Sequence, residues 1–99
     1  MRAMPLFVAE HEHPADRCPA GNAQMAPFLL QILSNENAKK AGLTIHADAV
    51  ASGQHHLYVI LEGPNQAAVQ QYLAPFGQAG SLKVTPASQC EEVVARGRC

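Results

Sequence analysis

The chain has 99 residues, a length typical of one domain and too short for a multidomain enzyme. Hydrophobic residues make up 47% and charged residues 15%, which is the composition of a folded globular protein and not of a disordered one. Seven Lys and Arg against eight Asp and Glu give a net charge of -1, so the sequence argues against nucleic acid or an anionic membrane as partner.

Targeting signals and cysteine usage indicate where the protein works. The apolar run 3–9 is far shorter than a membrane span and lacks the organisation of a signal peptide. The sequence therefore predicts no membrane association and a cytoplasmic location. Three cysteines with no close spacing argue against structural disulfides and point to thiol or metal chemistry.

The N-terminal half begins with a strand and continues with a helix. Met4, Leu6 and Val8 recur with a period of two until the chain turns polar and reaches Pro14. Ser34 is a favourable N-cap for a short continuation of the helix, which can stop at Gly42 in the left-handed conformation. The helix itself is predicted from one apolar stripe at helical spacing: Met25, Phe28, Leu29, Ile32 and Leu33.

The C-terminal half contributes a hairpin, a second helix and a last strand. Two alternating runs, 43–50 and 56–62, flank a turn at 52–54 and predict the hairpin. Asn65 is a candidate cap for the second helix, and a short strand follows before Pro86. The apolar stripe of that helix is Val69, Tyr72, Leu73 and Phe76.

The order of elements, β-α-β-β-α-β, predicts an α+β ferredoxin-like sandwich. Right-handed crossovers favour a four-stranded antiparallel sheet of order 4-1-3-2 with two main helices on one face. We expect this domain to span residues 1–86 and a C-terminal arm to span 87–99.

The alternation along the strands predicts which side chains the two faces of the sheet carry. Phe7, Tyr58 and Ile60 are too apolar to remain in water on an open face, so the sequence predicts a homodimer through that face. The helix-covered face is expected to carry Met4, Leu6, Val8, Ile45, Leu57, Val59, Leu61, Leu82 and Val84. The open face is expected to carry Phe7, His46, Asp48, Val50, His56, Tyr58, Ile60 and Lys83.

These features resemble the dimeric α+β barrel superfamily, and in particular small stand-alone bacterial ferredoxin-like proteins, most of them of unknown function. The resemblance covers about residues 4–86. It rests on the element order, on the strand 6–11 leading into a His and Cys segment, and on the hairpin 45–61. The superfamily includes haem degraders, quinone-forming monooxygenases, metal binders and proteins without known activity, so the resemblance implies the fold and leaves the activity open.

The first chemical motif is residues 11–19, with sequence HEHPADRCP. Two imidazoles and a thiol on a loop restricted by two prolines can surround one ion, and these donors suit zinc, copper or nickel. We expect His11, His13 and Cys18 to bind a soft transition metal. In the alternative interpretation the two histidines are solvated and Cys18 is a small buried hydrophobe.

The second motif is the arm, CEEVVARGRC from residue 90 to residue 99. Arg96 and Arg98 favour the thiolate of Cys99, so a thiol or sulfur-transfer protein with a reactive Cys99 is the rival hypothesis. A frayed tail is the third interpretation. We expect Cys90 to lie near His55 and His56, opposite the His11 cluster. Cys90 alone cannot complete that cluster, but an extended arm of nine further residues reaches about 30 Å, so Cys99 could return to Cys18 in its own chain or a partner's. The metal-binding hypothesis therefore takes Cys99 or Cys90 as a further ligand.

A third group is predicted on the open face, where His46, Asp48, His56 and Tyr58 come from adjacent strands. These side chains could serve acid/base chemistry in a monooxygenase-like enzyme with a cavity on that face. Polar pairing within a dimer interface is the other interpretation. The leading hypothesis from the sequence is a small cytoplasmic metal-binding protein.

Overall fold

The computed structural model describes residues 4–99, so the first three residues of the predicted domain lie outside the described part. Four antiparallel strands form one sheet in the order β2-β3-β1-β4, which confirms the predicted order. The strands are β1 (Leu6–Glu12), β2 (Thr44–Val50), β3 (His56–Glu62) and β4 (Ser81–Ala87).

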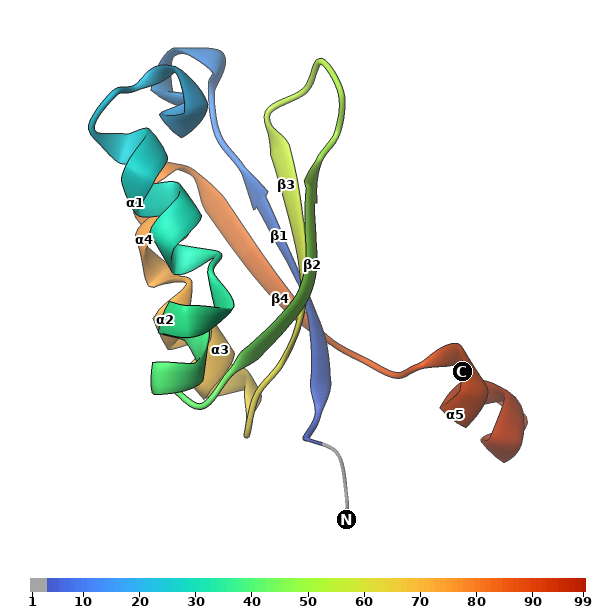
Figure 1. Cartoon of the computed structure of the whole chain (residues 1–99). Coiled ribbons are helices and arrows are strands. Elements are labelled where there is room, and N and C mark those ends of the chain that lie inside the picture. Colours follow the sequence, from blue (N-terminus) through green and yellow to red (C-terminus); the bar gives the residue numbers. More distant parts are fainter. Residues whose placement is uncertain (1–3) are drawn as a thin grey trace.

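The helices lie in one layer on one face of this sheet and leave its other face uncovered (Figure 1). Two short 3-10 helices connect β1 to this layer, and a last helix projects beyond the end of β4. The layer consists of α1 (Met25–Ile32), α2 (Asn35–Lys40), α3 (Gln66–Tyr72) and α4 (Ala74–Ala79), the 3-10 helices are η1 (Ala15–Arg17) and η2 (Pro19–Gly21), and the last helix is α5 (Cys90–Arg96). Within residues 4–99 no helix has both the length and the apolar character to cross a bilayer.

Local sequence signals account for the helix boundaries. Ser34 accepts a hydrogen bond from the backbone N–H of Asn37, and Asn65 accepts one from that of Ala68, so both predicted caps are confirmed. Gly42 has a φ of 80°, the left-handed stop expected after α2. The second predicted helix is divided into α3 and α4, because Pro75 lacks the N–H that a continuous helix would need there.

The core lies between the sheet and the helix layer. Leu43, Leu61, Leu73 and Val69 are its largest fully buried side chains. They come from the residue before edge strand β2, from central strand β3, and from α3 and the residue that follows it, so the core joins both halves of the chain. His11 is the buried polar residue among the residues described, with 2% of its surface exposed.

The predicted face assignment is wrong for β1. Phe7, Ala9 and His11 are buried against the helices, while Leu6 and Val8 are only half-buried on the open face. Both residue sets of this strand are apolar at positions 6 to 9, so alternation alone does not distinguish its faces. The register decides which face of β1 is buried, because Phe7 lies opposite Leu61 and therefore points to the same buried side of the sheet as Leu61.

The predicted face assignment is also wrong for the second half of β2. A register shift between Ile45 and Ala47 marks a bulge, after which Asp48 lies opposite Val59. Because Val59 faces the helices, the bulge moves Asp48 to the helix side of the sheet. Val50 follows it, opposite Leu57.

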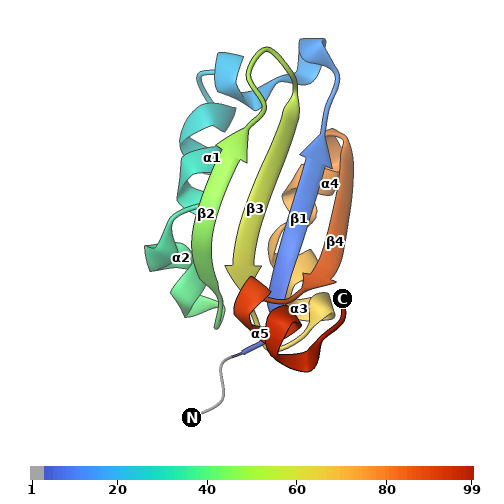
Figure 2. The ribbon, with the colours of Figure 1, turned by 90° about the vertical axis from the view of Figure 1, so that its right-hand side faces the viewer.

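The predicted position of the hairpin relative to the first strand is wrong as well. Glu12, at the end of β1, lies opposite His56, so the β2–β3 hairpin stands beside the loop that carries His13 and Cys18. Figure 2 shows the hairpin and the 3-10 segment together at one end of the sheet and α5 at the other. Cys90 does lie at the end where β1 begins, as expected, because Ala87 lies opposite Leu6.

Candidate metal centre

Three potential metal ligands converge at the end of β1. One ligand atom each of His13, Cys18 and His55 lies within 4.8 Å of the other two. They come from three segments: the residue after β1, the junction of the two 3-10 helices, and the residue before β3. The cluster therefore depends on the tertiary fold rather than on one loop.

The backbone explains how these segments meet. The antiparallel ladder of β1 and β3 continues past its last pair, and the N–H of His13 donates to the carbonyl of His55 at 3.2 Å. The turn 14–18 then brings the thiol back toward the strand, since the N–H of Cys18 donates to the carbonyl of Ala15 at 3.4 Å. Pro14 and Pro19 restrict the backbone on either side of this turn.

A chain of hydrogen bonds orients His13. Nδ1 of His11 lies 2.9 Å from the carbonyl oxygen of Ser81, and Nδ1 of His13 lies 3.0 Å from Nε2 of His11. The carbonyl oxygen only accepts, so Nδ1 of His11 carries the proton and its Nε2 accepts. His13 then donates from Nδ1, which leaves a lone pair on its Nε2.

Nε2 of His13 is the atom that points to a ligand. It is buried and has no hydrogen-bond partner among residues 4–99. A buried nitrogen without a partner carries a desolvation cost, and such groups are rare unless an ion, a water or a function accounts for them. This same atom belongs to the residue that lies with Cys18 and His55.

Burial favours the neutral form of both histidines in this chain of hydrogen bonds. Desolvation lowers the pKa of His11 below its ordinary value, an effect that the hydrogen bond to Ser81 opposes and the charge of His56 reinforces. Desolvation also lowers the pKa of His13, and the neighbouring His11 and His55 act in the same direction. Neutral imidazole is the form that binds a metal ion.

The cluster opens into a small cavity of about 60 Å³. Its other walls are mostly apolar side chains from β2, β3, α1 and α4. The rings around it are closely packed, since the centroid of His13 lies 5.1 Å from that of His55 and the centroid of His11 lies 5.0 Å from that of Phe76. The lining residues are His11, His13, Cys18, Pro19, Ala20, Leu29, Val50, Gln54, His55, Leu57 and Phe76.

The structure places the two cysteines of the arm away from this cluster within one chain. Cys90 begins α5 and Cys99 follows it, both exposed, at the opposite end of the sheet (Figure 2). The Arg96 guanidinium donates to the main-chain oxygen of Cys99 at 3.0 Å and to the Ser88 hydroxyl at 3.2 Å. These bonds fold the tail back along α5 rather than toward Cys18.

The four predicted open-face residues do not form one group. His46 pairs with Glu62 at 3.2 Å, at one end of the face. His56 stacks on Tyr58 with ring centroids 4.4 Å apart and contacts Glu12 at 3.2 Å, toward the other end. Asp48 is on the helix side of the sheet because of the bulge.

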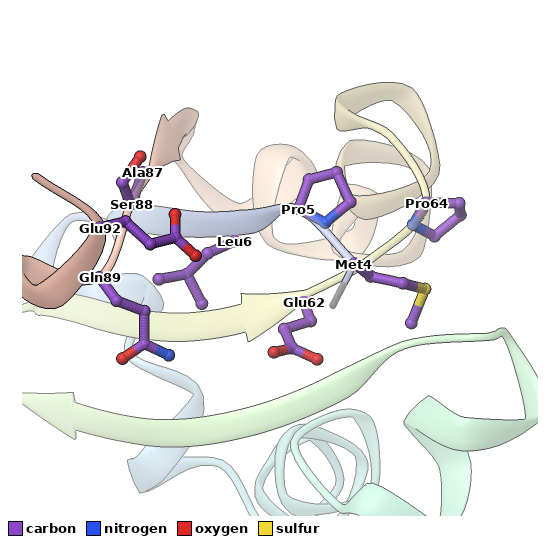
Figure 3. A pocket seen from close by; sticks show the side chains of 9 residues that line it. All are labelled: Met4, Pro5, Leu6, Glu62, Pro64, Ala87, Ser88, Gln89 and Glu92. Carbon is purple, nitrogen blue, oxygen red and sulfur yellow. The ribbon is translucent and has the colours of Figure 1, made fainter. Parts of the chain in front are cut away.

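A larger hollow of about 730 Å³ lies beneath the arm. Figure 3 shows Glu62 and Glu92 as the charged side chains among the residues that line it. No histidine or cysteine is among those lining residues. Since soft-metal and thiol chemistry need such donors, the His13 cluster is the better candidate for a functional site.

His55 is the ligand candidate that sequence reasoning placed at the wrong end. The signal for it was present, because β1 and β3 are antiparallel neighbours in the predicted sheet order, so the start of β3 lies beside the end of β1. Two consecutive histidines, His55 and His56, alternate in direction, so one of them must point toward the helix side. His56 takes the open face and His55 the cluster.

The sheet order and helix layer together define a ferredoxin-like α+β protein. Comparison with family models identifies it further: the model described as "Domain of unknown function (DUF3303)" matches residues 7–98, so the chain belongs to that family. Among solved structures, the chain is similar to a candidate antibiotic biosynthesis monooxygenase from Deinococcus radiodurans, with 18% sequence identity and a TM-score of 0.46. The match covers 87% of this chain and 92% of that chain. No curated protein matches the sequence.

Proposed function

We propose that the protein binds one soft transition-metal ion through Nε2 of His13, Sγ of Cys18 and a ring nitrogen of His55. The observation that carries this proposal is the convergence of the three donor atoms within 4.8 Å. The buried and unpartnered Nε2 of His13 supports it, because a bound ion would remove the cost of that orphaned lone pair.

The donor set selects the class of ion. Imidazole nitrogen and thiolate sulfur suit zinc, copper or nickel, whereas calcium and magnesium prefer oxygen. Three protein ligands are fewer than the four of a closed structural zinc site, and they match sites that keep a position for an exogenous molecule. The ligand set differs from the one expected from sequence, because His55 replaces His11 and neither Cys90 nor Cys99 is part of it.

His11 acts as a positioning residue in this proposal. Its Nε2 is occupied by the proton of His13, so it has no free lone pair for the ion. It holds the tautomer of His13 that presents Nε2, and Ser81 in turn holds the tautomer of His11. Metal-bound histidines in proteins commonly have such a partner on their other nitrogen.

We also propose that the protein forms a homodimer through its open sheet face. Tyr58 and Ile60 are each 39% exposed on that face, on the central strand β3. Leu6 and Val8 lie beside them on β1, only half-buried. Apolar side chains gathered on one uncovered sheet face are typical of an interface.

We propose that the protein works in the cytoplasm, where the thiol of Cys18 stays reduced.

The experiment that tests the metal site uses untagged protein. Stripped protein is titrated with zinc and cobalt, and bound metal is measured by elemental analysis after desalting. We expect one equivalent for the native protein and loss of it in the variants His13→Ala, Cys18→Ser and His55→Ala. His46→Ala and Cys90→Ser are matched controls, because both residues are exposed and remote from the cluster, and both variants should retain the metal. Full metal binding by His13→Ala would overturn the proposal.

A further inference from the structure

The proposed ion keeps one coordination position open toward the cavity. His13, Cys18 and His55 supply three ligand atoms, and no fourth His, Cys, Asp or Glu joins them in the described part of the chain. All three line the same cavity of about 60 Å³. An ion held by them therefore completes its coordination with a molecule that occupies this space.

The lining of the cavity restricts the chemistry of that molecule. Leu29, Leu57 and Phe76 form its walls and Val50 its rim, and no Lys or Arg is among the lining residues. Apart from the imidazoles and the thiol, Gln54 is the polar residue among those that line the cavity. Since no Lys or Arg lines the cavity, the metal ion would have to supply the positive charge, so a multiply charged anion such as phosphate would lose its hydration there without full compensation.

The volume of the cavity restricts the size of the bound molecule. A cavity needs roughly 10 to 15 Å³ to hold one water molecule, so about 60 Å³ has room for a handful of heavy atoms. Part of this space belongs to the ion. What is left fits a linear or bent molecule of about three heavy atoms better than a ring.

We infer that this site binds a small soft-donor molecule of about three heavy atoms or fewer, uncharged or singly charged, at the open position of its metal ion. The inference rests on the proposed function, because it needs the ion bound by His13, Cys18 and His55. To the proposed metal binding, the inference adds the class of small molecule that the metal site binds. The small molecule coordinates the metal through one donor atom while its remainder contacts Leu29, Leu57 and Phe76.

The test uses the cobalt-loaded protein with azide as probe and imidazole as size control. Cobalt reports changes of its coordination shell in its visible spectrum. We expect azide to change this spectrum in a saturable way with one site per cobalt, and imidazole to leave it unchanged. A wild-type cobalt protein whose spectrum does not respond to azide would overturn the inference, as would one that binds imidazole as well as azide.

Two variants fill the cavity without removing a metal ligand: Leu29→Trp from α1 and Val50→Phe from the rim. Both should retain one equivalent of cobalt and bind azide about tenfold or more weakly, because the larger side chain occupies the space beside the ion. Val50 is 58% exposed, so its variant keeps the test usable if Leu29→Trp does not fold. Unchanged azide affinity in a folded, cobalt-loaded variant contradicts the inference. Absence of cobalt binding in the native protein contradicts the proposed function instead, so the two failures are distinguishable.

Discussion

Nδ1 of His13 lies 3.0 Å from Nε2 of His11, and this contact decides which nitrogen of His13 is free. His11 is itself held at Nδ1 by the carbonyl of Ser81, 2.9 Å away. His13 donates to His11, and His11 donates to the carbonyl of Ser81, so the hydrogen bonds connect the candidate metal site to β4. A residue outside the proposed ligand set thus determines the tautomer of one within it.

The first prediction concerns His11. Replacing it with Phe removes the acceptor for His13, and we expect metal affinity to fall by about 10- to 100-fold with stoichiometry retained at high metal concentration. His11→Gln should lose less, because its amide offers a donor and an acceptor with a similar separation. Competition titration with a chromophoric chelator measures both. Equal losses in the two variants would indicate a packing role for His11 and not an orienting one.

The second prediction concerns pH and the stability of the metal-free protein. Burial lowers the pKa of His11 and His13 in the folded state, so below about pH 6.5 the unfolded chain binds more protons than the folded one. The free energy of unfolding should therefore fall as pH falls from about 7 to about 5. Urea titrations across this range measure it. His11→Phe should show a shallower dependence, and an identical slope would contradict the assignment to His11.

The third prediction concerns the close approach of Gly80 to β1. A Cβ at this position would collide with the carbonyl oxygen of Glu12 and with Cα of His13. Gly80→Ala should therefore destabilise the fold by about 1 to 3 kcal/mol, since backbone must move to admit it. Gly21→Ala is the control, because a Cβ there meets nothing within 4 Å. Chemical denaturation compares the two, and equal stability of both variants would contradict the predicted clash.

Metal binding by the Gly80→Ala variant gives a second measurement of the same backbone displacement. Displacing the backbone at Glu12 and His13 also shifts the residue that carries the free Nε2. Gly80→Ala should therefore weaken metal binding, while Gly21→Ala should not.

The fourth prediction concerns the open face. A lysine at Ile60 places a charge in the centre of the proposed dimer interface, so Ile60→Lys should be monomeric. Leu30→Lys is the control, because Leu30 is 70% exposed on α1, on the other side of the molecule. Size-exclusion chromatography with light scattering gives the mass of each. A native protein that is monomeric at micromolar concentration would remove the proposal, and a dimeric Ile60→Lys would place the interface elsewhere.

Local signals predicted two helix caps, and the order of elements predicted the sheet order. Ser34 and Asn65 cap helices where the sequence predicts them, because a capping side chain and its N–H are only a few residues apart. The strand order follows from element order and crossover handedness, which are properties of the chain as a whole. The division of the second helix also has a local signal, Pro75 at the start of α4.

Periodicity failed where both faces of a strand are apolar or where the strand is irregular. Leu6, Phe7 and Val8 offer the core three similar side chains, and the pairing of Phe7 with Leu61 selects the buried one. The bulge after Ile45 carries no distinctive residue, yet it reverses the direction of Asp48. A shift of one residue in register changes every following side chain, so such errors extend along the strand.

The sequence by itself determined the ferredoxin-like order of elements, the two helix caps and the placing of His13 and Cys18, two residues of the proposed metal site, in one short segment. Only the tertiary structure decided that His55 joins them and that His11 stands behind His13. The physical reason is that spacing along the chain constrains neighbours within a loop. Grouping His55 with His13 and Cys18, about 40 residues earlier in the chain, depends on strand register. Which nitrogen of His13 is free depends on its hydrogen bond to His11, and both features follow from long-range hydrogen bonds.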